Sequence, residues 1–409
     1  MNIKIFTNSS IDIKFLIILG FICANILGFF YSVICSKYNG DFLGVPVTLS
    51  HQILIVILLI IILQYVIIYF LFIYISNKIK TWHIIKENQI TPLFYYFLLL
   101  FLIINFLVTY YYGFPVAGKP YDYKYAFLIT RIKVTDAVFI LYCLERTNKK
   151  KNRLFWILVA GVIILNLYRG WTIHLFIFAS LELLIYFNSK VKLSKIIPIF
   201  IIGSIMIFFI YPKIYDLKIE QRGGSEIRTS AIDGLVHLSG RFSHFSQTAQ
   251  IFEKKDAVKK IMKSEIGEFH YLKDTLSVLL PAKYIKNYDD NKTLHSYIAV
   301  GFNDKFDFTA FHSRSITGIA GKMIATGLNS ITDSFIFLFY ITLVISFFIF
   351  VCQIINIKLQ YYSFLNIILF TLSGHIHEIL YPMILIIFWS IYIIILNYIG
   401  KTLKSMKIS

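Results

Sequence analysis

The sequence predicts an all-α, polytopic membrane protein with about ten transmembrane helices and one large hydrophilic loop. Hydrophobic residues make up 57% of the chain and charged residues only 15%, whereas a soluble domain is about 45–50% apolar and about 25% charged. The apolar residues are gathered in blocks of roughly 18–25 residues, the length that crosses a hydrocarbon core about 30 Å thick. Short lysine-rich segments separate several blocks, as is typical of the cytoplasmic ends of transmembrane helices.

The apolar pattern places ten expected spans along the chain. In chain order they cover residues 13–35, 52–76, 93–112, 126–145, 154–168, 171–188, 195–212, 331–353, 361–380 and 383–398. The chain is thereby divided into an N-terminal bundle of about seven spans (1–212), a large loop (213–330) and about three C-terminal spans with a tail (331–409). Because the number of spans is even, both termini are expected on the same side.

Four strongly basic segments predict the orientation. They read "SNKIKTWHIIKENQ", "ERTNKKKNR", "NSKVKLSK" and "GKTLKSMKIS", and the positive-inside rule places them in the cytoplasm. The large loop then faces outward. Because a structureless loop of that length is uncommon, we expect it to fold as a mostly helical layer on the outer surface, part of which returns to the membrane edge.

The net charge of +18 does not indicate a nucleic-acid partner, because much of the basic excess lies in the loops that orient the spans. The four cysteines show no CxxC spacing, so neither a zinc site nor a disulfide framework is predicted. We expect no metal and no cofactor.

Three ionisable residues, Arg131, Lys133 and Asp136, fall in the fourth expected span. An ionisable group inside a span costs about 2.5–3.5 kcal/mol on insertion scales, so each one needs a reason. Lys133 and Asp136 are three residues apart and can pair on one helix face. Arg131 either reaches toward the outer headgroups or lines an anion-binding cavity, and the sequence leaves both interpretations open.

Further arginines are expected at the outer surface. Arg169 stands in the turn "NLYRGWT", either as an interfacial anchor beside aromatic residues or as a phosphate-binding group, since a guanidinium binds phosphate oxygens bidentately. In the large loop, Arg222 and Arg228 precede Arg241, which lies in "GRFSHFSQTAQIFE". This clustering favours an anion site, and the alternative is an ordinary solvated helix surface.

Histidines mark two more candidate sites. His312 and Arg314 precede the glycine-spaced stretch "SITGIAGKMIATG", whose small residues allow close helix contact, and they offer a base and a cation. His375, His377 and Glu378 lie in "SGHIHEILYP" at the end of the ninth expected span. HxHE alone is a poor zinc motif, so we favour a polar cluster that lines an outer cavity. The proline that ends this stretch is expected to break the helix.

The topology and four short stretches resemble the O-antigen polymerases, integral membrane glycosyltransferases that join oligosaccharide repeat units at the outer face of the bacterial inner membrane. The stretches are "GRFSHFSQTAQIFE", "LYRGWT", "DTLSVLLPAKYIKN" and "SITGIAGKMIATG". The resemblance covers most of the chain by topology and these stretches by residue. Many members have a glutamate where this chain has Lys322, which leaves the acid/base assignment open.

The resemblance implies a GT-C-like helical architecture in the inner membrane and a reaction. A glycan on undecaprenyl pyrophosphate would pass to the hydroxyl of a new lipid-linked unit, with a chain-length regulator and a flippase as pathway partners. Departure of pyrophosphate builds negative charge, which fixed cations stabilise, and the acceptor hydroxyl needs a base. The residues expected to act in catalysis are Arg169, Arg241, His312 and Arg314, and those expected to bind substrate are Arg131, Arg222, Arg228, His375, His377 and Glu378.

Two other functions stay open. An O-antigen ligase resembles this fold and uses the same donor but transfers glycan to lipid A-core, and a histidine before the last membrane re-entry, as in "FHSR", is typical of it. A lipid-linked oligosaccharide flippase or another transporter would usually have more spans, short uniform loops and inverted repeats. The large loop argues against a transporter.

Overall fold

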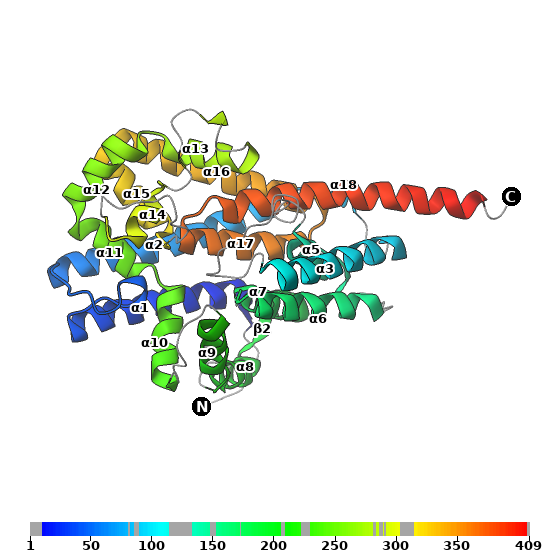
Figure 1. Ribbon diagram of the computed structural model, residues 1–409, viewed down its shortest axis with the longest axis horizontal. Helices are drawn as coiled ribbons and strands as arrows, with labels where there is room; N and C mark the ends of the chain where they lie inside the picture. Colours follow the sequence, from blue (N-terminus) through cyan, green and yellow to red (C-terminus); the bar gives the residue numbers. More distant parts are fainter. Residues whose placement is uncertain are drawn as a thin grey trace.

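The structure, a computed structural model, consists almost entirely of helices, several of which run along one long direction (Figure 1). It describes residues 10–80, 82–85, 90–113, 133–147, 153–171, 173–205, 209–221, 230–280, 284–285, 289, 292–302 and 315–406. The helices are α1 (Ile13–Cys35), η2 (Gly40–Phe42), α2 (His51–Lys78), α3 (Pro92–Tyr112), α5 (Val134–Glu145), α6 (Arg153–Tyr168), α7 (Ile173–Tyr186), α8 (Leu193–Ile205), α9 (Tyr211–Gln221), α10 (Ala231–Phe242), α11 (Phe245–Glu253), α12 (Lys255–Ile261), the π-helical turn η4 (Met262–Ile266), α13 (His270–Leu279), α14 (Leu294–Ala299), α15 (Gly318–Asn329), α16 (Ile331–Ile355), α17 (Leu359–Ser373) and α18 (His377–Met406). Two short strands, β1 (Ser10–Asp12) and β2 (Lys190–Lys192), pair antiparallel beside the start of α1.

Five helices of the described chain are long and apolar enough to cross a bilayer, namely α1, α2, α3, α16 and the first part of α18. These helices indicate a helical membrane protein. Each of the other five expected spans contains a helix, but α5, α6, α7, α8 and α17 have only 12, 16, 14, 13 and 15 residues. Helix length thus supports five spans, and the expected count of about ten is not confirmed.

The expected boundary between the last two spans is wrong. α17 ends at Ser373, and Gly374 takes a left-handed conformation with φ +72°. Glycine suits this position because a Cβ there would also lie 2.4 Å from the Thr317 hydroxyl oxygen. α18 already begins at His377, so Pro382 lies inside it and does not break the helix. The turn at Gly374 separates the two helices before this point. At the sixth position of α18, proline removes one backbone hydrogen bond and crowds the Glu378 carbonyl, and the helix continues past it.

The described part of the large loop is mostly helical, as expected. Helices α11 to α15, called the helical layer below, gather at the left-hand end of the molecule in Figure 1. Glycines allow close contacts within the layer and beside it, at the end of α10. A Cβ on Gly240 would lie 2.6 Å from the Cα of Gly40, and a Cβ on Gly318 would lie 2.2 Å from the His244 ring. Glycine is the residue that allows such close approach.

A partly buried glutamine connects the layer to the apolar helices. Gln64 of α2 donates its amide N–H to the Thr371 carbonyl of α17 at 3.0 Å, and its amide oxygen accepts from the Ala320 N–H of α15 at 2.6 Å. Ala320 is in the first turn of α15, where a backbone N–H has no partner within the helix. One polar side chain of a membrane helix therefore fixes two other helices.

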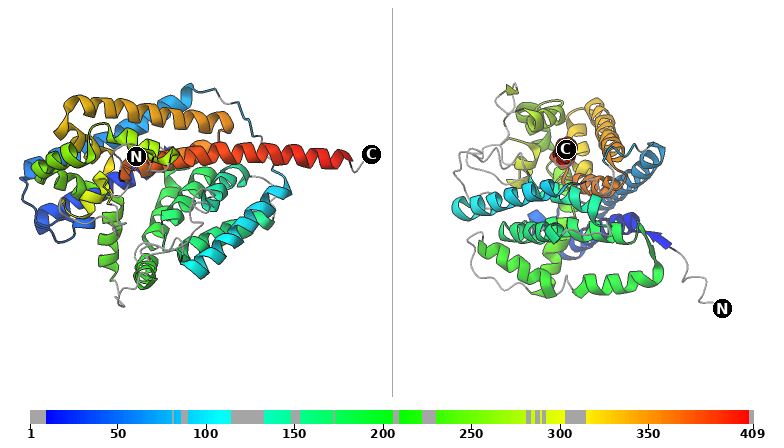
Figure 2. Two further views of the ribbon diagram at one scale, coloured as in Figure 1. Left: turned by 45° about the horizontal axis from the view of Figure 1, so that its top comes forward. Right: turned by 90° about the vertical axis from the view of Figure 1, so that its right-hand side faces the viewer.

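The opposite end of the bundle gathers segments that were expected to share one side of the membrane. The Ile85 N–H donates to the Ile355 carbonyl at 3.1 Å, and the Asn356 amide donates to the Ile85 carbonyl at 2.9 Å. Tyr361 donates to the Asn188 side chain at 2.9 Å. The left view of Figure 2 shows the last part of α18 extending past the neighbouring helices.

Candidate functional site

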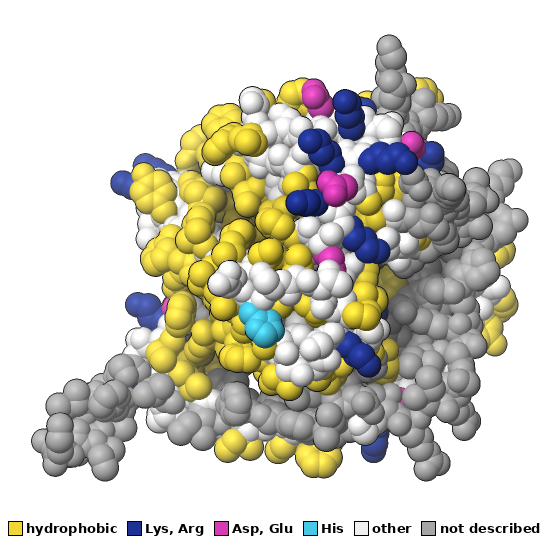
Figure 3. Space-filling model, turned by 90° about the vertical axis from the view of Figure 1, so that its left-hand side faces the viewer, with side chains coloured by type: hydrophobic (Ala, Val, Ile, Leu, Met, Phe, Trp, Pro, Cys, Tyr) yellow, Lys and Arg dark blue, Asp and Glu magenta, His cyan; other side chains and the backbone are white. Residues whose placement is uncertain are grey.

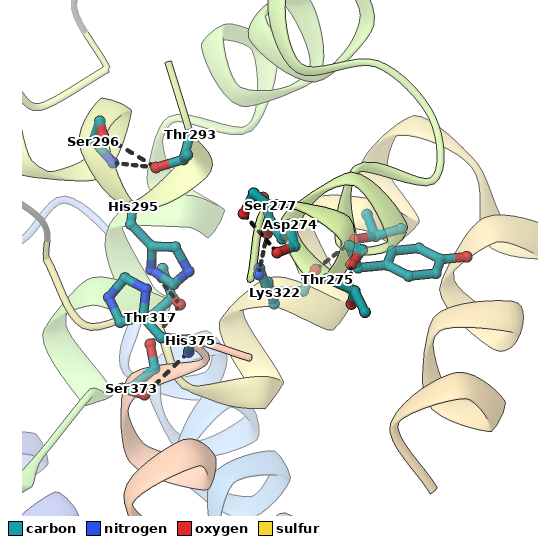
Figure 4. A network of polar contacts seen from close by, with 12 residues as sticks. Asp274, Thr275, Ser277, Thr293, His295, Ser296, Thr317, Lys322, Ser373 and His375 are labelled. Atoms are coloured by element: carbon teal, nitrogen blue, oxygen red, sulfur yellow. Dashed lines mark hydrogen bonds and ion pairs between the residues drawn. The ribbon is translucent and has the colours of Figure 1, made fainter. Parts of the chain in front are cut away.

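A buried ion pair connects two helices of the helical layer, α13 and α15, close to the start of α18. Lys322 of α15 donates to the Asp274 carboxylate of α13 at 2.9 Å, and both residues are buried (Figure 4). Asp274 and His270 lie four residues apart and so share the buried face of α13. Burial alone would raise the pKa of Asp274, but the charge of Lys322 and the hydrogen bond that Lys322 donates help to hold the pKa below its ordinary value. Asp274 is therefore a carboxylate at neutral pH.

His270 adds an unpartnered imidazole to this pair. It is only 3% exposed, and neither ring nitrogen has a hydrogen-bond partner among the described residues. Burial, reinforced by the positive charge of Lys322, lowers its pKa to about 4. The ring is then neutral near pH 7, with one nitrogen a donor and the other an acceptor. Because buried polar groups nearly always have a hydrogen-bond partner, His270 is available to a ligand hydroxyl or a water molecule.

Two stacked histidine rings lie near this ion pair. The rings of His295 on α14 and His375 lie 3.6 Å apart with an interplanar angle of 28° (Figure 4). The Nδ1 atom of His295 lies 3.1 Å from both the Ser315 carbonyl and the Thr317 hydroxyl. Thr317 in turn donates to the Ser373 carbonyl at 3.0 Å, at the end of α17. The segment that precedes α15 thus fixes the histidine stack against the turn between α17 and α18.

A cavity of about 290 Å³ opens beside these groups, at the lower end of the range for small-molecule sites. A second cavity of about 10 Å³, called the extension below, shares the lining residues Asp274 and Thr293 with it and is also lined by the stacked histidines. The cavity is lined by Glu265, Ile266, His270, Lys273, Asp274, Asp289, Lys292, Thr293 and Leu294, and the extension by Asp274, Thr293, His295, Lys322, His375, Ile376 and His377. Lysine ammonium groups, carboxylates and histidine rings therefore line a space that could hold a polar ligand. In the part of the chain that the structure describes, no group of three or more histidine, cysteine or acidic residues could hold a metal ion.

The outer face of the helical layer carries charges of both signs. Figure 3 shows basic and acidic side chains interspersed with hydrophobic ones on this face. The exposed residues of α12 include Lys255, Asp256 and Lys259. This face therefore has no uniformly basic surface.

Arg169 is buried, not at the surface as the turn between two spans suggested. It is 4% exposed and donates to Thr109 at 3.0 and 2.8 Å and to the Asn105 side chain at 2.9 Å. The Trp171 ring lies 6.0 Å away. No carboxylate of the described residues lies within ion-pair distance of Arg169. The uncharged oxygens that hold Arg169 come from α3, about sixty residues earlier in the chain, so the local sequence could not show them.

The expected ion pair between Lys133 and Asp136 is not formed among the described residues. α5 begins at Val134, so Lys133 has an extended backbone and does not share a helix face with Asp136. Its ammonium lies 4.4 Å from the centroid of the Tyr381 ring, and Asp136 accepts a hydrogen bond from the Tyr362 hydroxyl.

The predicted cluster of His375, His377 and Glu378 divides between two places. The two histidines line the extension of the cavity. Glu378 interacts electrostatically with Lys133 and Asp136 of the neighbouring α5 segment. The interpretation as a polar cluster at a cavity therefore applies to the histidines.

The stretch from Gly240 to Glu253 mainly docks the helical layer. The Ser243 hydroxyl and the His244 N–H both donate to Asn25 of α1, at 3.2 and 3.1 Å. His244 itself is fully buried beside α15, and burial lowers its pKa to about 3. Arg241 is exposed at the end of α10 and interacts electrostatically with Tyr211 of α9. The buried part of the stretch is thus explained by packing, and its arginine points away from that core.

Five predicted site residues, Arg131, Arg222, Arg228, His312 and Arg314, lie outside the described residues. Sequence reasoning missed Asp274, His270 and His295, and it noted Lys322 only as a departure from a family pattern. One local pattern could have indicated two of them, because His270 and Asp274 fall on one face of an amphipathic segment. Lys322 follows Asp274 by 48 residues, so no local pattern predicts their pairing.

Comparison of the chain with known protein families, with curated proteins and with solved structures finds no match.

Proposed function

We propose that this protein is a membrane glycosyltransferase of the O-antigen-polymerase kind, which joins polyprenyl-pyrophosphate-linked oligosaccharides in the cavity between α13, α15 and α18. The observation on which the proposal rests is the unpartnered, neutral imidazole of His270 beside the buried Lys322–Asp274 pair. These groups lie next to apolar helices long enough to cross a bilayer, where a lipid-linked sugar would be presented. The short stretches that resemble O-antigen polymerases support the same class of reaction.

The reaction assigns a role to each group. The oxygen of the acceptor hydroxyl forms a bond to the anomeric carbon of the donor glycan, while the bond from that carbon to the pyrophosphate oxygen breaks. The hydroxyl proton passes to a base, and polyprenyl diphosphate leaves. In the proposal Asp274 helps to orient the hydroxyl and His270 accepts its proton. Lys322, held in place by Asp274, stabilises the charge that builds on the leaving group.

The proposed location is the bacterial inner membrane, with the helical layer facing outward. Described residues of two basic segments, Ile85 and Asn188, contact the connection between α16 and α17 and the start of α17 at the end of the bundle opposite the layer. This supports the expectation from the positive-inside rule that these segments share a cytoplasmic end. In this arrangement a flippase would deliver the substrate to the side of the cavity, and a chain-length regulator would act on the product.

Lipopolysaccharide from a gene-deletion strain tests the proposal. A polymerase deletion should give core with a single repeat unit and no ladder, and the wild-type gene should restore the ladder. Core without any repeat would instead indicate a ligase or a flippase.

Two variants test the site in the same strain. His270→Gln keeps a polar side chain of similar size and should abolish the ladder, as should Asp274→Asn, while Lys259→Ala on the exposed face of α12 should leave it unchanged. A normal ladder from His270→Gln and from Asp274→Asn, at normal protein level, would remove this cavity from the mechanism.

A further inference from the structure

α13 presents three different faces. Tyr271 faces α16, and His270 and Asp274 line the cavity. On the remaining face Leu272, Leu276 and Leu279 are 40%, 42% and 56% exposed. These three residues are called the leucine stripe below. A contiguous apolar stripe on a helix indicates a surface that contacts something other than water.

Contacts with α16 fix the level of α13 along a helix long enough to span the membrane. The Tyr271 hydroxyl donates to Asp333 at 2.9 Å, and the Tyr271 ring lies 5.2 Å from the Phe337 ring and 5.4 Å from the Tyr340 ring. One turn further along α13, the Thr275 hydroxyl is hydrogen-bonded to the Tyr340 hydroxyl. These side-chain contacts place α13 beside the first half of α16 (Figure 1).

The surface of α16 at this level is apolar as well. Phe335 and Phe339 are 68% and 67% exposed, and Ile336, which precedes Tyr340 by one turn, is 40% exposed. α16 is one of the five helices whose length and composition fit a bilayer, so its exposed aromatic residues are expected to contact lipid. Because Tyr271 and Thr275 contact this part of α16, the leucine stripe lies at the same level as its apolar surface.

We propose that the leucine stripe lies in the hydrocarbon layer of the membrane half nearest the helical layer, so that α13 is embedded in the bilayer without crossing it. Its 10 residues span about 15 Å at 1.5 Å per residue, half of a core about 30 Å thick. The presence of exposed apolar residues at the same level of α13 and of the membrane-length helix α16 favours lipid over a second protein as the occupant. The cavity behind α13 then opens beside lipid. A second consequence rests on the proposed function: a lipid-linked head group reaches His270 and Asp274 from the side.

Fluorescence quenching in lipid nanodiscs tests this placement. Single cysteines replace Leu272 or Leu276 in a chain whose native cysteines, Cys23, Cys35, Cys143 and Cys352, are changed to alanine, and each carries a bimane label. Phe339→Cys on α16 is the matched lipid-facing control, and Lys259→Cys on α12 is the exposed aqueous control. A phospholipid with a spin label on its acyl chain is the hydrophobic quencher, and iodide is the aqueous quencher.

We expect the two α13 labels to be quenched by the spin-labelled lipid to about the same extent as at Phe339 and at least about threefold more than at Lys259. Quenching by iodide at the level of Lys259 would overturn the proposal. Protection from both quenchers would also overturn it, because another protein, such as a second copy of the chain, would then cover the stripe. The result does not depend on catalysis, so it can hold even if the proposed function fails.

Discussion

Replacing Lys322 by methionine tests whether the buried ion pair is as important as its geometry indicates. Methionine keeps most of the side-chain length but leaves the Asp274 carboxylate, which is only 7% exposed as a residue, without the ammonium 2.9 Å away. Removing one partner of a buried pair costs about 3–5 kcal/mol, because the other charge remains buried and uncompensated. Lys322→Met should therefore lower the free energy of unfolding by about that amount.

The assay is equilibrium unfolding in mixed detergent micelles, followed by tryptophan fluorescence, on a double-mutant cycle. Asp274→Asn should lower the free energy of unfolding by a similar amount. The loss in the double variant Asp274→Asn/Lys322→Met should be smaller than the sum of the two single losses by at least about 2 kcal/mol. Lys292→Met is the control. Its partner Glu265 lies 3.2 Å away on the same cavity, but the two side chains are 43% and 35% exposed, so the loss should stay below about 1 kcal/mol. If both single variants at the buried pair also lose less than about 1 kcal/mol, the reasoning is refuted.

Three further outcomes are expected. Gly318→Ala should prevent recovery of monodisperse protein in gel filtration, because Gly318 has φ +65° and a Cβ would lie 2.2 Å from a buried histidine ring. The control Gly327→Ala, where the atom nearest to the new Cβ is 3.6 Å away, should behave as wild type. The folded-state pKa of His270 is about 4 and the ordinary value is 6.5, so the unfolded chain takes up the proton first as the pH falls. The free energy of unfolding should therefore fall by about 3 kcal/mol as the pH drops from about 6.5 to about 4. An equally steep pH dependence in His270→Gln would contradict this. Arg169→Ala leaves two buried acceptors unpaired and should lower the free energy of unfolding by about 1–3 kcal/mol, and Arg169→Lys should restore little of it. Arg241→Ala, at an exposed position, should change the free energy of unfolding by less than about 0.5 kcal/mol. Equal losses in the two alanine variants would show that burial of the guanidinium does not decide its contribution.

The helices could be predicted from the sequence because their apolar blocks are local. α1, α2, α3 and α16 begin and end within two residues of the expected spans. The boundary between α17 and α18 could not be predicted, since it depends on Gly374, whose neighbour Thr317 comes from a different part of the chain. The rule that proline breaks a helix then pointed to the wrong residue.

The candidate site could be predicted only in part, and for the same physical reason. His375 and His377 were recognised because polar residues at the end of an apolar block are costly and visible in the sequence. Lys322 and Asp274 each look like an ordinary surface charge until α13 and α15 pack together. Arg169 looked like an interfacial group, but the Asn105 and Thr109 side chains of α3 enclose it. Local pattern thus predicts helices, whereas pairing between helices decides which charges are buried.

The most direct test of the central proposal is glycan transfer by the purified protein in nanodiscs, with undecaprenyl-pyrophosphate-linked oligosaccharide as both donor and acceptor. The wild-type protein should form longer lipid-linked chains together with free undecaprenyl diphosphate, and His270→Gln should form neither while eluting as folded protein. A purified wild-type protein that forms no new glycosidic bond, or a His270→Gln variant that is as active as wild type, would contradict the account.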